Sequence, residues 1–246
     1  MEIVRPFIIT TRPEKKYTSV SGDCFEVVNI PVTEVHISSR VEEVKEELIQ
    51  FNPDVIVLTS FTGSKILMSL GISGNFKFIC IGEKTALPLI DSGLDVFIPE
   101  EKNSYGLADY IERYVDKSDK IALCRSEQHD NYIDTFLTKN GYVFKNFTLY
   151  SLTAIPFDSI INYIEMRNCM GILFTSSLEA KVVNEFLLKK HKSDVLNHKK
   201  VFSIGKMTSN TLKKYKIKTE TMESESNFEE LLKEITKKYC SSGEWI

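Results

Sequence analysis

The chain has 246 residues, of which 42% are hydrophobic and 26% are charged, and its formal net charge is −3. A chain of this length and composition can bury a sizeable apolar core without a metal or a disulfide. Its slightly negative charge provides no global basic field of the kind that attracts nucleic acid or an anionic membrane. We therefore expect neither as a partner, and we expect any polyanionic ligand to be held by a local site.

Short runs rich in β-branched residues alternate with helical stretches along the chain. The predicted strands are, in chain order, Phe7–Thr11, Phe25–Ile30, Val55–Thr59, Phe78–Ile81, Val96–Ile98, Ile121–Cys124, Val143–Leu149, Gly171–Thr175 and Val201–Ile204. This alternation is typical of an α/β protein whose parallel sheets are covered by helices.

Several intervening helices have recognisable end signals. A helix over residues 40–51 is expected to end before Pro53, because the residue before a proline disfavours helical geometry. Asp130 can cap a helix that Asn140 and Gly141 terminate. Residues 226–229 have the spacing of a capping box.

The chain contains a long internal repeat. Its first copy includes Leu58-Thr59-Ser60 and Ile81-Gly82-Glu83-Lys84-Thr85, and its second includes Phe174-Thr175-Ser176 and Ile204-Gly205-Lys206-Met207-Thr208. Because the repeat is far longer than a solenoid unit, it indicates duplication of a whole domain, giving two domains of roughly 120 residues each.

The repeat permits two ways of dividing the chain. If the strands of one copy are labelled d, e, a, b and c, the whole chain reads d-e-a-b-c-d-e-a-b-c. Each copy could form its own domain, or the middle five strands could fold together while the first two join the last three. Periodicity does not choose between these, although Pro31 and Pro156 mark extended segments suited to crossings between domains.

Four turns with hydroxyl residues or glycine follow predicted strands. In a parallel sheet, ligands bind beyond the carboxyl ends of the strands, where helices present free N–H groups. Helix capping is the commoner role for any single serine or threonine. Four turns in two related pairs nevertheless predict an anion-binding rim, made of Thr59, Ser60, Gly82, Thr85, Ser176, Ser177, Gly205 and Thr208.

Four larger polar side chains are further candidates. Arg12 and Arg125 end their predicted strands and can pair with carboxylates, although each could instead form a surface salt bridge. Tyr150 ends an e strand beside a proposed crossing and so near the gap between domains, although packing is the commoner role of a strand tyrosine. Lys200 is placed where a site could use it, whereas the other paired lysines are expected to be solvated.

Cysteine and histidine usage suggests neither disulfides nor a metal. The five cysteines are widely spaced without a Cys-x-x-Cys pair, so we expect reduced, buried thiols in a cytoplasmic protein. The four histidines lack metal-ligand spacing, and we expect no metal site. The first ten residues lack signal-peptide features, and no apolar run approaches membrane-spanning length. No dinucleotide fingerprint, Walker loop, nucleophile elbow or zinc-protease motif is present.

In order and spacing, these pieces resemble the uroporphyrinogen III synthases of tetrapyrrole biosynthesis. The likeness covers nearly the whole chain and is carried by Thr11-Arg12-Pro13, Leu58-Thr59-Ser60, Ile81–Ala86, Val96–Glu100, Leu149-Tyr150, Phe174-Thr175-Ser176 and Ile204-Gly205. It implies two Rossmann-like domains, each a parallel sheet flanked by helices, joined by a two-stranded β-ladder. One domain would be discontinuous, over residues 1–31 and 153–246, and the inserted one would span 36–147, with crossings at 32–35 and 148–152.

The resemblance also implies a monomeric enzyme that works without a cofactor. Its substrate would be hydroxymethylbilane, a linear tetrapyrrole with eight carboxylates, which is closed with loss of water and inversion of the last ring. Tyr150 matches the family's favoured proton donor. Expected contacts to propionate and acetate groups are Thr59, Ser60, Gly82, Thr85, Ser176, Ser177, Lys200, Gly205 and Thr208.

The chain departs from the family pattern in the second copy. Lys206 and Met207 stand where proline and threonine are common, and Leu178 follows Ser177 where a proline is usual. A cytoplasmic two-lobed anion-binding or sensor module without catalytic activity is the alternative. A two-lobed glycosyltransferase is disfavoured, because no acidic nucleotide-sugar motif is evident.

Overall fold

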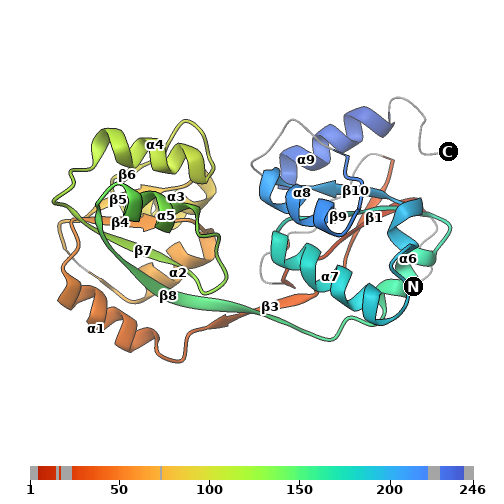
Figure 1. Ribbon diagram of the computed structural model, residues 1–246, viewed down its shortest axis with the longest axis horizontal. Coiled ribbons are helices and arrows are strands. Elements are labelled where there is room, and N and C mark those ends of the chain that lie inside the picture. The colour runs from red at the N-terminus through yellow and green to blue at the C-terminus, as the bar shows by residue number, and fades with distance from the viewer. Residues whose placement is uncertain (1–4, 15–16, 18–23, 73, 221–227, 241–246) are drawn as a thin grey trace. The chain divides into compact units, whose positions relative to one another are not determined.

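The computed structural model describes residues 5–14, 17, 24–72, 74–220 and 228–240 (Figure 1). Contacts divide the chain into two compact units. Unit 1 comprises Met1–Glu34 and Thr153–Ile246, and unit 2 comprises Val35–Leu152. The chain therefore leaves unit 1 after its first strands and returns to it for the last third of its length.

Unit 2 contains a six-stranded sheet in the order β3-β8-β7-β4-β5-β6. Its strands are β3 (Thr33–Ile37), β4 (Val55–Leu58), β5 (Lys77–Cys80), β6 (Val96–Phe97), β7 (Lys120–Ser126) and β8 (Val143–Ala154). From β8 to β6, neighbouring strands run parallel. The helices of unit 2 are α1 (Val41–Phe51), α2 (Phe61–Ser69), α3 (Glu83–Ile90), α4 (Ser104–Tyr114) and α5 (Tyr132–Lys139).

Alternating side chains of β4 enter two separate apolar clusters. Ile56 and Leu58 belong to one cluster, and Val55 and Val57 belong to the other. Successive side chains of a strand point to opposite faces of a sheet, so helices cover both faces of this one. All four residues are at most 1% exposed.

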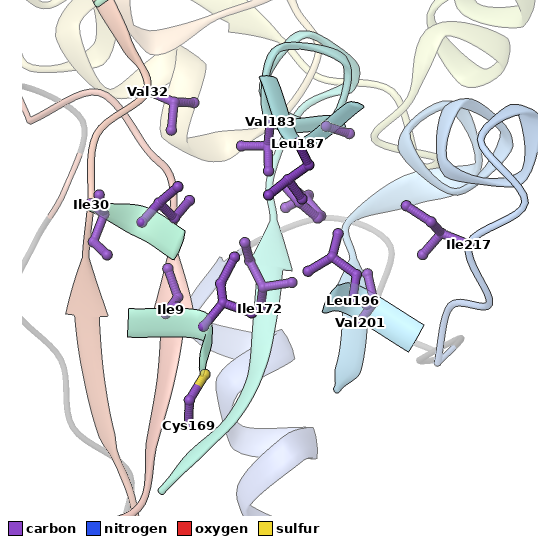
Figure 2. Packing of buried hydrophobic residues seen from close by; sticks show 14 of the residues in the cluster. Ile9, Ile30, Val32, Cys169, Ile172, Val183, Leu187, Leu196, Val201 and Ile217 are labelled. Atoms are coloured by element: carbon purple, nitrogen blue, oxygen red, sulfur yellow. The ribbon is translucent and has the colours of Figure 1, made fainter. Parts of the chain in front are cut away.

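Unit 1 contains a four-stranded parallel sheet in the order β10-β9-β1-β2. Its strands are β1 (Phe7–Thr10), β2 (Glu26–Asn29), β9 (Cys169–Phe174) and β10 (Lys200–Ser203). Its helices are α6 (Ile160–Glu165), α7 (Ser177–Lys189), the 3-10 helix η2 (Val195–His198), α8 (Gly205–Lys214), α9 (Phe228–Ile235) and the π-helix η3 (Thr236–Cys240). Figure 2 shows the cluster on one face, which includes Ile9 and Ile172, while Ile8 and Leu173 enter the cluster on the other face.

The two sheets have the same strand order. In unit 2 the strands β8, β7, β4, β5 and β6 lie side by side, which is the order e-d-a-b-c of the repeat. In unit 1, β2, β1, β9 and β10 follow this order, and Glu220 forms a parallel bridge to Phe202 at the place of strand c. In each sheet, therefore, the strands are those expected if the middle five strands of the repeat fold together and the first two join the last three.

Each predicted strand overlaps an observed one, but the sequence patterns missed β3 and the last five residues of β8. Helix α1 ends as expected, with Asn52 in a left-handed conformation at φ 49°. The Asp130 carboxylate accepts the Tyr132 N–H at 3.0 Å, but the N-cap of α5 is Asn131, one residue later than predicted, and it makes no side-chain capping bond. Ser226 and Asn227 of the predicted capping box lie outside the described residues.

The expectation of five reduced cysteines is wrong. Cys24 and Cys240 form a disulfide, with their Cα atoms 5.6 Å apart. They are 216 residues apart in sequence, and their pairing was hidden because it depends on η3 packing beside the start of β2. The other three cysteines are free, buried thiols, as expected.

Two further expectations concern membranes and metals. None of the described helices is long and apolar enough to span a membrane. Among the residues in the described ranges, no group of three or more histidine, cysteine, aspartate or glutamate side chains is arranged to hold a metal ion.

Candidate functional site

In unit 2, Tyr150 and Ser60 meet at the carboxyl edge of the sheet. Ser60 follows β4 and caps α2, since its Oγ accepts the Gly63 N–H at 3.0 Å. The Tyr150 hydroxyl donates to the same Oγ at 2.9 Å. A serine hydroxyl has two acceptor positions and one hydrogen to donate. Both acceptor positions of Ser60 are therefore filled, which leaves its hydrogen available to a ligand oxygen.

Tyr150 is a buried phenol, only 3% exposed. Burial raises the pKa of Tyr150 above its usual value, and hydrogen bonds with Ser60 and Ser126 offset part of that increase. Ser126 ends β7 and lies opposite Tyr150 in the β7–β8 register. The phenol is therefore protonated at neutral pH and can act as a donor, but as a weak acid.

The second turn of unit 2 places Gly82 and Thr85 at the same edge of the sheet. Gly82 is the N-cap of α3 and has no side chain to cap it, and its carbonyl accepts the N–H groups of Thr85 and Ala86, both at 3.1 Å. Thr85 is buried, whereas Thr59, which precedes Ser60, is partly exposed. These residues share one edge because β4 and β5 are parallel neighbours.

Arg125 is occupied within unit 2. Its Nη2 donates to an Asp134 carboxylate oxygen, and its Nε donates to Asn146 Oδ1 at 2.9 Å. Asn146 Nδ2 donates to Asp134 at 2.7 Å and closes the group. Although desolvation raises the pKa of Asp134, the hydrogen bonds from Arg125 and Asn146 outweigh it and hold this pKa below its usual value. The arginine is thus engaged in an ion pair within unit 2, and its side chain is 4% exposed.

In unit 1, a buried carboxylate organises the turn after β9. Glu179 is 3% exposed and accepts hydrogen bonds from the Thr11 hydroxyl, the Thr175 N–H and the Thr175 hydroxyl, all at 3.1 Å. Ser176 Oγ accepts the Glu179 N–H at 3.2 Å and caps α7, whose first residue is Ser177. Glu179 therefore links the carboxyl ends of β1 and β9.

Arg12 follows Thr11 at this edge. Its guanidinium carbon lies 4.5 Å from the centre of the Phe228 ring. Burial lowers the pKa of Arg12, while the charges of Glu179 and Glu229 offset part of that decrease. The arginine is thus held between an aromatic ring and nearby carboxylates rather than fully solvated.

The last turn lies after β10. Gly205 is the first residue of α8 and has a φ of 70°, a conformation that favours glycine. Thr208 is buried, while Met207 is 52% exposed. Met207, one of the residues that depart from the family pattern, is therefore directed to solvent and does not belong to the core.

Lys200 is not brought together with the other candidates. It begins β10, whereas Thr175 and Gly205 follow the carboxyl ends of β9 and β10. Since these strands are parallel, Lys200 lies at the opposite edge of the sheet. Its Nζ lies 3.5 Å from Glu220 Oε1.

The sequence patterns missed Glu179 and Ser126. The spacing Ser176-x-x-Glu179 is a capping-box signal and could have identified Glu179. In this protein the Glu179 side chain accepts a hydrogen bond from Thr175, the residue before the N-cap Ser176. Ser126 had no comparable signal, because its proximity to Tyr150 depends on the pairing of β7 with β8.

The fold and its edges define the class: a duplicated α/β protein with two mainly parallel sheets flanked by helices, each with hydroxyl-rich turns at its carboxyl edge. Residues 18–235 match the family model described as uroporphyrinogen-III synthase HemD. The chain therefore belongs to this family. No protein with a curated description matches the chain by sequence.

Two solved structures illustrate the shared fold. One is a variant of uroporphyrinogen III synthase from Thermus thermophilus, 14% identical, with a TM-score of 0.64 and coverage of 96% of this chain and 99% of that chain. The other is uroporphyrinogen-III synthetase from Helicobacter pylori, 18% identical, with a TM-score of 0.65 and the same coverage. At these identities the similarity is one of fold.

Proposed function

We propose that this chain is a uroporphyrinogen III synthase, which cyclises hydroxymethylbilane with loss of water and inversion of ring D. The observation that carries the proposal is the family match over residues 18–235. The two solved synthases that share its fold are consistent with it. The reaction uses no cofactor in this proposal, and the protein acts as a monomer.

In the proposed mechanism, the terminal hydroxyl of the substrate leaves with the help of a proton, giving an electrophilic azafulvene. The far ring attacks through its substituted carbon, and the resulting spiro intermediate fragments and recloses. The same substrate also cyclises spontaneously without inversion. Holding the geometry is therefore the main task of the protein.

We assign the acid function to the Tyr150–Ser60 pair. Tyr150 is buried, but its hydrogen bond to Ser60 lets it increase the acidity of the serine hydrogen that remains available. Ser60 would contact the leaving hydroxyl directly or through a water, and Tyr150 would act through Ser60. Because the pKa of Tyr150 is raised, the phenol is a weak acid, and a water can replace it. We therefore expect it to add only a modest factor to the rate.

The substrate carboxylates would be bound at the carboxyl edges of the two sheets. The proposed contacts are Thr59, Ser60, Gly82 and Thr85 in unit 2, and Arg12, Ser176, Ser177, Gly205 and Thr208 in unit 1. Helix N-termini and small hydroxyl residues suit carboxylate oxygens. We retain the predicted boundaries as part of this proposal: domains over residues 1–31 with 153–246 and over 36–147, with crossings at 32–35 and 148–152.

The test is to supply freshly made hydroxymethylbilane, oxidise the products and separate uroporphyrin isomers I and III. We expect isomer III to form in proportion to protein, above a control without protein. Isomer I alone, formed at the rate of that control, would show that the chain is not a synthase. Binding of the tetrapyrrole without any change in isomer ratio would instead identify a non-catalytic binding module.

A further inference from the structure

A polar cavity lies at the amino edge of the unit 1 sheet, opposite to the edge that carries the proposed substrate contacts. It has a volume of about 590 Å³. Its floor includes Cys169, Leu196 and Val201, which belong to the buried cluster drawn in Figure 2. Lys200 and Val201 at the start of β10 place it at the amino edge of the sheet.

Positive charge dominates the cavity lining. Five cationic side chains line it, namely Arg167, Lys199, Lys200, Lys216 and Lys218, against the single carboxylate of Glu220. The chain as a whole has a net charge of −3, so the sign of this cavity is opposite to that of the molecule. A cleft lined by one sign of charge focuses the electrostatic field and concentrates ions of the other sign.

Two of the five cations have local structural roles. Lys199 Nζ donates to the carbonyl of Met166 at 3.1 Å and to that of Cys169 at 2.8 Å, and Met166 is the C-cap of α6. Lys200 lies near Glu220. Cations commonly occupy the carboxyl ends of helices in this way.

The other three cations are not explained by such contacts. Within the described residues, the side chains of Arg167, Lys216 and Lys218 have no hydrogen-bond or ion-pair partner. They come from two separate segments, the connection between α6 and β9 and the segment after α8. Nothing in the described fold requires three unpaired cations around one cavity.

Lys216 is also held in an unfavourable backbone conformation. Its φ is 61°, and its N–H and that of Ile217 donate to the carbonyls of Lys213 and Leu212, closing α8 with the hydrogen bonds of a Schellman motif. Glycine is the usual residue at this position because it has no Cβ. A lysine here therefore lowers local stability, and a contribution of its side chain to binding would explain its presence.

We infer that this cavity binds a small anion bearing two or more charged groups, such as a polyphosphate or a polycarboxylate. The guanidinium of Arg167 can form two parallel hydrogen bonds to such a group, and Lys216 and Lys218 supply further charge. The inference does not depend on the proposed function, because it concerns the opposite edge of the sheet.

Calorimetric titration of the full chain with inorganic pyrophosphate, and separately with citrate, tests the inference. We expect one saturable event with a dissociation constant below about 1 mM, weakened by added salt. Binding of pyrophosphate alone would identify a phosphate ligand, and binding of both would identify a general polyanion site. Absence of saturable binding for both probes would overturn the inference.

Matched charge variants locate the binding. The triple variant Arg167→Gln, Lys216→Gln and Lys218→Gln should weaken binding at least tenfold. A control that replaces Lys189, Lys213 and Lys214 with glutamine removes three exposed cations of unit 1 that do not line the cavity. It should change affinity less than twofold. Equal losses in both triple variants would overturn the site, because binding would then follow overall charge.

A third variant separates binding from folding. Lys216→Gly should keep or raise the melting temperature while weakening binding, because glycine suits the left-handed position. His191→Gly makes the same backbone change after α7, where His191 has a φ of 56° and does not line the cavity. It should leave affinity unchanged. If neither Lys216→Gly nor the triple variant weakened binding, the assignment of the anion to this cavity would be refuted.

Discussion

At the scale of single residues, the Tyr150–Ser60 hydrogen bond connects a buried donor to an accessible hydroxyl. In the proposed mechanism, this arrangement would let a side chain that is 3% exposed influence a proton transfer at the edge of the sheet. It also separates two roles that substitution can distinguish. Ser60 would touch the substrate, whereas Tyr150 would polarise Ser60.

Replacement of Tyr150 by phenylalanine should lower kcat for isomer III roughly tenfold to hundredfold without abolishing it, because a water can replace a positioned acid. Ser60→Ala should lower kcat at least as much, and the double variant should be no worse than Ser60→Ala. Tyr142→Phe is the control, since it removes another buried tyrosine hydroxyl of unit 2, which bonds to the Ile111 carbonyl at 3.3 Å. Additive losses in the double variant would contradict action through Ser60.

Glu179 supports the turn of unit 1 in a comparable way. Glu179→Leu would leave the Thr11 hydroxyl and two Thr175 donors without their acceptor, and we expect unfolding free energy to fall by about 2–4 kcal/mol. Glu185→Gln on the same helix removes the charge that pairs with exposed Lys181 and interacts with the Tyr215 hydroxyl, and should cost less than about 1 kcal/mol. Urea denaturation measures both. Similar losses would show that Glu179 has no special structural role.

The Arg125–Asp134 pair predicts a pH dependence. The pKa of Asp134 is lower in the folded state than in the unfolded chain, so its stabilising contribution is present above the unfolded pKa of about 4 and is lost as pH falls through the folded pKa. Asp134→Asn should therefore be less stable than the parent at pH 6 and lose less stability between pH 4 and pH 2. Urea midpoints across this range test it, and parallel curves would contradict it.

At the scale of elements, hydrophobic runs predicted strands well when both faces of the strand were buried. β4 and β5 were identified for this reason, since helices cover both faces of their sheet. The hydrophobic patterns missed β3 because it is partly exposed, with only Thr33 and Val35 buried, and only the family resemblance implied a ladder there. It lies at the end of the sheet beside β8, a pairing that no local pattern reports.

Gly171 shows how closely β9 and β10 approach. A Cβ at this position would lie 2.3 Å from the Lys200 carbonyl oxygen, which belongs to the backbone of the neighbouring strand. Gly171→Ala should destabilise the protein by about 1–3 kcal/mol. Ile172→Val, one residue further along β9, should cost about 0.5–1.5 kcal/mol and serves as the control. Thermal unfolding compares them, and an alanine variant as stable as the parent would show that the strands can separate.

At the scale of the whole molecule, the duplicated sequence predicted which turns would share an edge of each sheet. Thr175, Ser176 and Gly205 lie together in unit 1 because their strands are parallel neighbours. Strand direction also explains the failure for Lys200, which is close to Gly205 in sequence but at the opposite end of β10. The Glu179 contacts with Thr11 could not be predicted, because 168 residues separate them.

The disulfide is a long-range feature whose effect on stability can be measured. Replacing Cys24 and Cys240 with serine should lower the unfolding free energy by about 2–4 kcal/mol, because the bond restricts the unfolded chain over 216 residues. A reductant should lower the stability of the parent to that of the double variant and leave the variant unchanged. Guanidinium denaturation with and without reductant measures both, and a parent insensitive to reductant would contradict the prediction.

The strand order of unit 1 has a consequence for biosynthesis. β1 and β2 leave the ribosome before the other strands of both sheets, yet the remaining neighbour of β1 is β9, which begins at Cys169. All of unit 2 is synthesised in the interval, and its parallel strands pair with one another within residues 55–150. The inserted unit can therefore fold while β1 still has an unpaired edge. That edge stays open to aggregation or to chaperones until β9 emerges.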